Sequence, residues 1–244
     1  MENIGESKIR NQEFKEKFNR ENLLKHIVGI ESPFILDVGA HKGESVAYLK
    51  QIFPKGVVFS IEPDPDSFSV LSANSVEGVH YFNLALSDAD GEASFYRNKI
   101  SHTNSLLKVN TCSEDSIGIA RALAERDQKY FENFNEEIKV TTFTLNTFSK
   151  KYSIGQIDLL KIDVQGAECR ILAGGREILG KTKTIILEIS FYDYYENQSS
   201  FLDVERILEP YSFRLYSISD ISNNPMNGRT DWAEVVYKNH RLLD

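Results

Sequence analysis

Residues 34–64 most constrain the fold, because they are typical of a strand, a glycine-bearing turn, an amphipathic helix and a second strand that stops at an acid. The turn places Asp37, Gly39 and Gly43 at D-x-G-x-x-x-G spacing, and Glu62 ends the second strand about 20 to 25 residues later. In such half-sheets, an acid at that point accepts hydrogen bonds from a ribose diol. The segment therefore predicts an α/β fold that binds an adenosine-containing ligand.

The turn differs from that of dinucleotide enzymes. Gly39 permits backbone angles that other residues avoid, and Gly43 would let the next helix lie close to the strand. Ala40 and His41 follow Gly39, so the G-x-G-x-x-G order that cradles a pyrophosphate is missing, which disfavours a nucleotide-binding dehydrogenase. A D-x-G turn can also be a plain tight turn. The E-P-D-P ending of the second strand argues against that, because its two prolines should leave an exposed acid at the sheet edge.

Composition narrows the class of protein. Of the 244 residues, 41% are hydrophobic and 26% are charged, which is typical of one soluble α/β domain. The formal net charge of -8 would repel a phosphate backbone, so no nucleic-acid partner is expected. No apolar run approaches the roughly 20 residues needed to span a bilayer, and the first residues lack the apolar core of a signal peptide. We expect a cytoplasmic protein without an integral membrane segment.

The N-terminal half contains further elements. Apolar residues at near-helical spacing predict a helix over 11–29, so that residues 1–30 would cap the sheet or the ligand. A third strand is predicted over 79–86, and Asp90-Gly91 indicates a hairpin to an added strand. A long exposed loop over 98–112 and a charged helical excursion over 114–134 follow. Together they predict a lid-like insertion at about 98–136 in a single domain spanning 31–244, with a solvated excursion as the alternative.

The C-terminal half resumes the α/β pattern. Residues 138–152 predict a strand and a short helix, and two buried strands then end near the acids Asp163 and Glu188. Ligands of open α/β sheets bind at the carboxyl ends of the strands, so both acids are expected there. A helix over 200–209 and two final strands, joined without a helix, complete seven core strands with an antiparallel last pair. These final strands are predicted over 211–218 and 232–238.

Five ordered motifs between about Phe34 and Lys238 then resemble the FkbM family of methyltransferases: LDVGAHKGE, IEPDP, NLALSDADGEASFY, DLLKIDVQGAE and IILEIS. The resemblance implies a Rossmann-like class I methyltransferase fold, with a seven-stranded, mostly parallel sheet, an antiparallel last strand and helices on both faces. It also implies S-adenosylmethionine as the methyl donor, with S-adenosylhomocysteine as product. The implied acceptor is usually a hydroxyl of a sugar, glycan, polyketide or related natural product.

The resemblance carries cofactor residues onto this chain by motif. The family often has Asn where His41 stands, and His41 could donate to the methionine carboxylate or pack under the turn. Asn83 and Ala85 would lie near adenine, and Val164 would line the methionine. The expected cofactor-binding residues are Asp37, Gly39, Ala40, His41, Gly43, Glu62, Asn83, Ala85 and Val164.

Methyl transfer to a hydroxyl needs a base. Asp163 is the first candidate because its strand should end where the methyl group would lie, and Glu188 and His102 are the second choices. Asp163 could instead cap the next helix or orient the donor's ammonium group. His102 stands in a polar segment where a histidine is usually only solvated.

The residues give less support to other kinds of chemistry. No Asp-Asp or Asp-Asn pair follows the strand that ends at Asp163, so we expect no metal. Cys112 and Cys169 have neither zinc nor redox spacing. An amine or carboxylate acceptor on the same fold, and a non-catalytic S-adenosylmethionine-binding protein, are the alternatives. The aromatic residues of 191–195, with Trp232, are expected to select a small-molecule or glycan acceptor, or to form a core or a homodimer contact.

Overall fold

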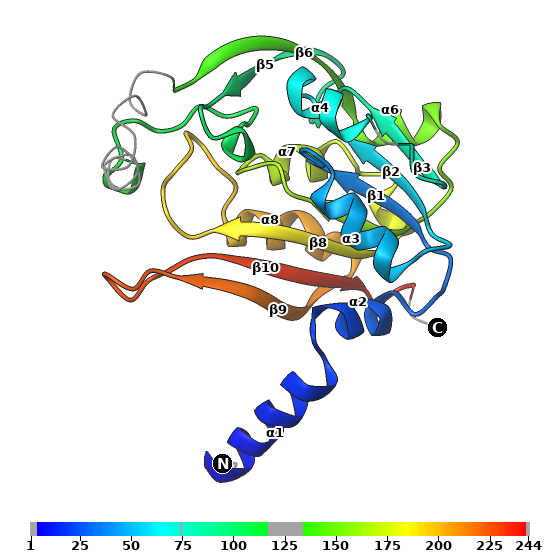
Figure 1. The fold of residues 1–244 in the computed structure, drawn as a ribbon, viewed down its shortest axis with the longest axis vertical. Coiled ribbons are helices and arrows are strands. Elements are labelled where there is room, and N and C mark those ends of the chain that lie inside the picture. The colour runs from blue at the N-terminus through cyan, green and yellow to red at the C-terminus, as the bar shows by residue number, and fades with distance from the viewer. Residues whose placement is uncertain (1–3, 74, 117–133, 243–244) are drawn as a thin grey trace.

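The computed structural model describes residues 4–73, 75–116 and 134–242, and its centre is a seven-stranded sheet (Figure 1). Five neighbouring strands run parallel, whereas β10 is antiparallel to both of its neighbours. The expected mostly parallel sheet with an antiparallel closing pair is confirmed. In sheet order, the strands are β3 (Val79–Phe82), β2 (Val57–Ile61), β1 (Phe34–Val38), β7 (Ile157–Ile162), β8 (Thr182–Ser190), β10 (Thr230–Asn239) and β9 (Phe213–Asn223).

Helices cover both faces of this sheet. On one face lie α2 (Arg20–Val28) and α3 (Glu44–Ile52), packed against Ile35 and Leu159. The opposite face, which includes Leu36 and Leu160, packs against α6 (Leu145–Lys151), α7 (Glu168–Ala173) and α8 (Phe201–Leu208). Because both faces are buried, the central strands carry apolar residues on both faces rather than alternating with polar ones, with Asp37 in β1 and Lys161 in β7 as charged exceptions. The remaining helical elements are α1 (Ile4–Lys17), α4 (Pro65–Leu71) and the short 3₁₀ turns Ser101–Thr103, Leu179–Lys181 and Glu209–Tyr211.

The strand predicted over 79–86 is two strands in different sheets. β3 ends at Phe82, and the side-chain amide of Asn83 donates to the carbonyl oxygens of Glu62 (2.9 Å) and Pro63 (3.1 Å). The chain then enters a second, three-stranded sheet in the order β4-β6-β5. Its strands are β4 (Ala85–Ser87), β6 (Glu136–Thr144) and β5 (Gly91–Arg97).

The hairpin predicted at Asp90-Gly91 is wrong, because β6 lies between β4 and β5. The Asp90 carboxylate instead accepts hydrogen bonds from the backbone nitrogen of Thr144 (2.6 Å) and the hydroxyl of Thr147 (2.7 Å). It therefore joins the turn after β4 to the start of α6. Asp64, expected to be exposed, is buried as the N-cap of α4 and forms an ion pair with Arg97 at 2.9 Å.

The helix predicted over 11–29 is divided. α1 ends at Lys17, and α2 begins after Asn19, whose side chain accepts a hydrogen bond from the backbone nitrogen of Asn22 at 2.8 Å. α2 packs on the sheet, whereas α1 projects away from the body and leaves Phe14 48% exposed (Figure 1). Within the predicted cap of residues 1–30, α2 is thus the helix that covers the sheet.

The loop predicted as exposed over 98–112 is folded onto the carboxyl edge of the sheet. Leu106, Leu107 and Val109 are buried, and the Ser105 hydroxyl donates to the carbonyl oxygen of Gln165 at 2.8 Å. Most of the helix predicted over 114–134 lies outside the described residues.

At the far edge of the large sheet, β9 pairs with β10 through three shifts of register, the first between Thr230 and Trp232. Among the described residues, no helix is long and apolar enough to cross a membrane.

Candidate functional site

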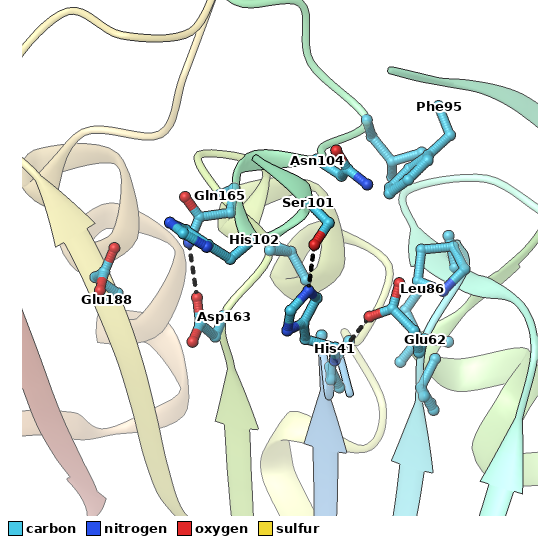
Figure 2. A pocket seen from close by; sticks show the side chains of 17 residues that line it. His41, Glu62, Leu86, Phe95, Ser101, His102, Asn104, Asp163, Gln165 and Glu188 are labelled. Atoms are coloured by element: carbon cyan, nitrogen blue, oxygen red, sulfur yellow. Dashed lines mark hydrogen bonds between the residues drawn. The ribbon is translucent and has the colours of Figure 1, made fainter. Parts of the chain in front are cut away.

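The carboxyl ends of β2, β1, β7 and β8 converge on a pocket of about 280 Å³ (Figure 2). β4 and the segment 98–109 complete its walls, so the second sheet covers the end of the first. The pocket brings together eight of the residues expected from the sequence. They are Gly39, His41, Glu62, Ala85, His102, Asp163, Val164 and Glu188.

The turn after β1 is held by backbone contacts. Gly39 has φ of +83°, and a Cβ atom there would lie 1.9 Å from the carbonyl oxygen of Asp163, so only glycine is accommodated. The backbone nitrogens of Gly39 and Ala40 both donate to the carbonyl oxygen of Ile61 at 3.0 Å. Ala40 is buried beside the pocket, and Gly43 precedes α3 with φ of +103°. The spacing of this motif thus fixes how the turn packs between its neighbouring strands.

His41 joins this turn to the segment above it. Its backbone adopts φ of +48°, and its nitrogen donates to Glu62 Oε2 at 2.9 Å. The ring nitrogen Nε2 lies 2.8 Å from the Ser101 hydroxyl, and Nδ1 lies 3.5 Å from a carboxylate oxygen of Glu44. The ring therefore has partners on the protein at both nitrogens.

Glu62 is fixed on the pocket wall by two backbone donors. Its Oε1 accepts from the Asp64 nitrogen at 2.8 Å, while Oε2 accepts from His41. Burial raises the pKa of Glu62 to about 7, although the two hydrogen bonds oppose this shift. The protein itself therefore fixes the orientation of this side chain.

Four expected cofactor residues do not line this pocket: Ala40 and Gly43, which belong to the turn, and Asp37 and Asn83. Asp37 is fully buried beneath the turn, where it accepts a hydrogen bond from the Ser45 hydroxyl at 2.6 Å. Its other oxygen lies 3.5 Å from the ammonium nitrogen of Lys161. Asn83 uses its side-chain amide to hold the backbone after β2. Both side chains support the walls from behind.

Asp163 lies at the tip of β7, in the middle of the converging strand ends (Figure 2). Its side chain is 37% exposed, Oδ1 accepts from Gln165 Nε2 at 3.0 Å, and Oδ2 lies 3.3 Å from Lys161 Nζ. The residue is therefore both oriented and accessible.

Lys161 is a site residue that the sequence analysis missed. The available signal was a lysine within the otherwise apolar strand IDLLKI. Its side chain is only 16% exposed, and burial alone would lower its pKa. The nearby carboxylates of Asp163 and Asp37 more than offset that effect, so the pKa is raised and the ammonium group stays charged.

The two other candidate bases also line the pocket. Burial raises the pKa of Glu188 to about 8, and the negative charge of Asp163 adds to this shift. Burial lowers the pKa of His102, and the nearby His41 acts in the same direction. At neutral pH, Glu188 therefore holds its proton and is poorly suited to accept another.

The aromatic residues after β8 divide into two groups. Tyr194 and Tyr195 are buried against the segment 98–109, and the Tyr195 hydroxyl donates to the carbonyl oxygen of Thr103 at 2.9 Å. Phe191 is 47% exposed. Of the roles expected for the aromatic residues of 191–195, Tyr194 and Tyr195 therefore have the one in the core.

Cys112 and Cys169 are free thiols. In the described part of the chain, no group of three or more His, Cys, Asp or Glu side chains is arranged to hold a metal ion.

Comparison with known proteins identifies the family. Residues 37–215 match the model of the methyltransferase FkbM domain. The chain is 32% identical over 169 residues to the 2-O-methyltransferase NoeI of Sinorhizobium fredii, covering 68% of this chain and 67% of that protein. It is 26% identical over 193 residues to the 31-O-demethyl-FK506 methyltransferase FkbM of Streptomyces tacrolimicus, covering 70% of each.

A solved structure, the methyltransferase FkbM of Methylobacillus flagellatus, is similar with a TM-score of 0.49 and 14% identity. The match covers 84% of this chain and 44% of that one. Because the family model spans most of the sequence and matches the strands that build the pocket, the chain belongs to the FkbM family of methyltransferases.

Proposed function

We propose that this protein transfers a methyl group from S-adenosylmethionine to a hydroxyl group of a sugar, glycan or related natural product. The observation that carries the proposal is the charge of the pocket. Among the described residues, its lining includes Glu62, Asp163 and Glu188 but no lysine or arginine. Although Glu188 is mostly protonated at neutral pH, Asp163 and the ionised fraction of Glu62 leave the lining negative rather than positive. This disfavours the phosphates of a dinucleotide and suits a cation such as a sulfonium.

The residues present fit the adenosine part of this cofactor. The fixed carboxylate of Glu62 can accept hydrogen bonds from ribose hydroxyls. Ala85, Leu86 and Leu106 give the pocket apolar walls, which suit a flat base, and Leu86 lies beside Glu62 (Figure 2). Gly39 and Val164 lie toward Asp163, where the methionine part would be held.

The bound cofactor would supply an electrophilic methyl group, and the protein would position the acceptor and receive its proton. Asp163 is suited to receive that proton because its carboxylate is accessible and is oriented by Gln165. The ammonium group of Lys161, 3.3 Å from Oδ2, also helps to hold the Asp163 side chain in place. The names of the relatives from S. fredii and S. tacrolimicus, both O-methyltransferases, support oxygen as the acceptor atom.

Calorimetric titration tests the cofactor assignment. We expect the wild-type protein to bind S-adenosylmethionine and S-adenosylhomocysteine with micromolar affinity and not to bind NAD. Glu62→Ala and Glu62→Gln should weaken both by roughly 10- to 100-fold, because hydrogen bonds to a charged acceptor are lost. Glu77→Ala, at an exposed glutamate, is the matched control. Thermal melting would verify that each variant is folded; binding of NAD alone would refute the proposal.

A further inference from the structure

A second cavity, of about 400 Å³, meets the pocket at Asp163 and Glu188. It lies over β7, β8, β10 and β9 on the face of the sheet that α2 and α3 partly cover. Strand register builds its floor, because Glu234 pairs directly with Glu188, and Trp232 pairs with Ser190. We call this cavity the acceptor groove; its lining includes Arg20, Lys161, Asp163, Glu188, Trp232 and Glu234.

Each ionised side chain that lines the acceptor groove is in an ion pair within the protein. The Arg20 guanidinium lies 3.0 Å from Asp220 and 2.5 Å from Glu234, and it fixes the start of α2 over the sheet. Lys161 is paired with Asp163. Glu188, whose pKa burial raises to about 8, is mostly protonated at neutral pH. A charged ligand would have to break one of these pairs, whereas a neutral ligand with many hydroxyl groups could hydrogen-bond to them.

Trp232 adds a flat apolar surface to this polar lining. It is half-buried and is the only tryptophan in the chain. An indole ring provides contact area for the C–H face of a ring-shaped ligand, while the neighbouring carboxyl and guanidinium groups reach its hydroxyls. The same groove thus offers both kinds of contact that a cyclic polyol requires.

We propose that the acceptor groove binds a neutral, polyhydroxylated ring, such as a pyranose, with its face packed on Trp232 and one hydroxyl directed at Asp163. This inference rests on the proposed function, which requires an acceptor beside the pocket. It assigns Trp232 and the Arg20–Glu234 pair as binding residues that determine acceptor specificity.

The lone tryptophan gives a direct test that does not depend on turnover. The protein loaded with S-adenosylhomocysteine is titrated with methyl glycosides of glucose, galactose, mannose and rhamnose, up to tens of millimolar, while its fluorescence is recorded. At least one glycoside should change the Trp232 emission saturably, and glucosamine and glucuronate should act more weakly. No response to any glycoside, or a stronger response to either charged sugar, would overturn the proposal. Tyr216→Ala is the control, because this aromatic residue of β9 is 46% exposed and lies outside the lining of the groove.

Kinetics with a responding glycoside provide the second readout. Trp232→Ala should raise the KM for the glycoside about tenfold, as expected when an aromatic contact is truncated, and leave the KM for S-adenosylmethionine unchanged. Equal changes in both constants, or in neither, would contradict the assignment. If S-adenosylhomocysteine fails to bind in calorimetry while the glycoside response persists, the methyltransferase proposal fails and the groove stands. If S-adenosylhomocysteine binds but no glycoside changes the fluorescence, the methyltransferase proposal stands and the proposal for the groove fails.

Discussion

The two cavities that share Asp163 and Glu188 are built in different ways. The pocket lies where the turn after β1 and the end of β2 meet β4, the segment 98–109 and the residues after β7, and its lining has carboxyl groups but, among the described residues, no lysine or arginine. The acceptor groove takes Arg20, Lys161 and Glu234 from three distant parts of the chain and holds its ionised side chains in ion pairs. The comparison teaches that one carboxyl edge of a sheet can present a cavity without cationic side chains on one side and a cavity of paired charges on the other.

The largest effect is expected at Asp163, one of the two residues that both cavities share. Asp163→Asn removes the proposed proton acceptor and should lower kcat by about 10²- to 10⁴-fold, the usual contribution of a general base. The affinity for S-adenosylhomocysteine should change little, since the amide has nearly the same shape. Asp88→Asn, at an exposed aspartate, is the control. Full activity of Asp163→Asn in single-turnover assays would exclude this role.

Lys161→Met should destabilise the protein, because it leaves the buried carboxylate of Asp37 without its cation. The free energy of unfolding should fall by roughly 3 kcal/mol, as expected when one partner of a buried pair is removed. Lys183→Met, which breaks a more exposed pair with Asp158, should cost less than about 1 kcal/mol. Urea denaturation measures both free energies of unfolding. Equal losses in the two variants would show that the buried pair of Lys161 contributes no more to stability than the more exposed pair of Lys183.

Glu188→Gln should change how stability depends on pH. The pKa of Glu188 is about 8 in the folded protein and near 4.5 when unfolded, so the folded state holds this proton more tightly. Its contribution is complete below pH 4.5 and is lost as the pH rises through 8. Relative to wild type, the variant should therefore gain roughly 1–3 kcal/mol of stability between pH 5 and pH 8, after allowance for solvent screening.

Denaturation across that pH range, with Glu77→Gln at an exposed site as control, measures this difference. A difference between Glu188→Gln and wild type that does not vary with pH would show that Glu188 is not held protonated.

The smallest effect on stability is expected for Arg20→Met, because Arg20 and Asp220 are both nearly half exposed. The free energy of unfolding should change by less than about 1 kcal/mol. Glu234 would then lack its cation, so the Trp232 fluorescence response to glucosamine should strengthen relative to that of a neutral glycoside. An unchanged preference would mean that the Arg20–Glu234 pair does not set the charge of the groove. Arg10→Met, in α1, is the matched substitution outside the groove.

The sequence predicts the parts of the site that depend on local patterns. The turn with Gly39 and the acid Glu62 lie within one strand-turn-helix-strand unit, whose periodicity and glycine spacing are visible in the chain. Asp163 and Glu188 are likewise marked by the apolar strands that precede them. Their presence in one pocket follows from the parallel order of β1, β7 and β8.

The remaining parts depend on contacts between distant residues. The run VHYFNLAL has a pattern that predicts one strand, but its two halves lie in different sheets. The chain leaves the first sheet at Asn83, as the contacts of that side chain show. Arg20 and Glu234 form an ion pair because α2 lies over β10. The two residues are far apart in the sequence, so no local pattern predicts this contact. Lys161 was visible as a charge in an apolar strand, yet its partners Asp37 and Asp163 become clear only from the packing.

The irregular pairing of β9 with β10 has a consequence for solubility. β9 is the last strand of the sheet, is 11 residues long and exposes Leu215, Ile218 and Ile221. A long, flat, apolar strand with free backbone groups is a template for aggregation. The three shifts of register bend and twist this border, so that a second extended chain cannot align with it over its full length. The irregularities therefore protect the protein against fibril-like self-association.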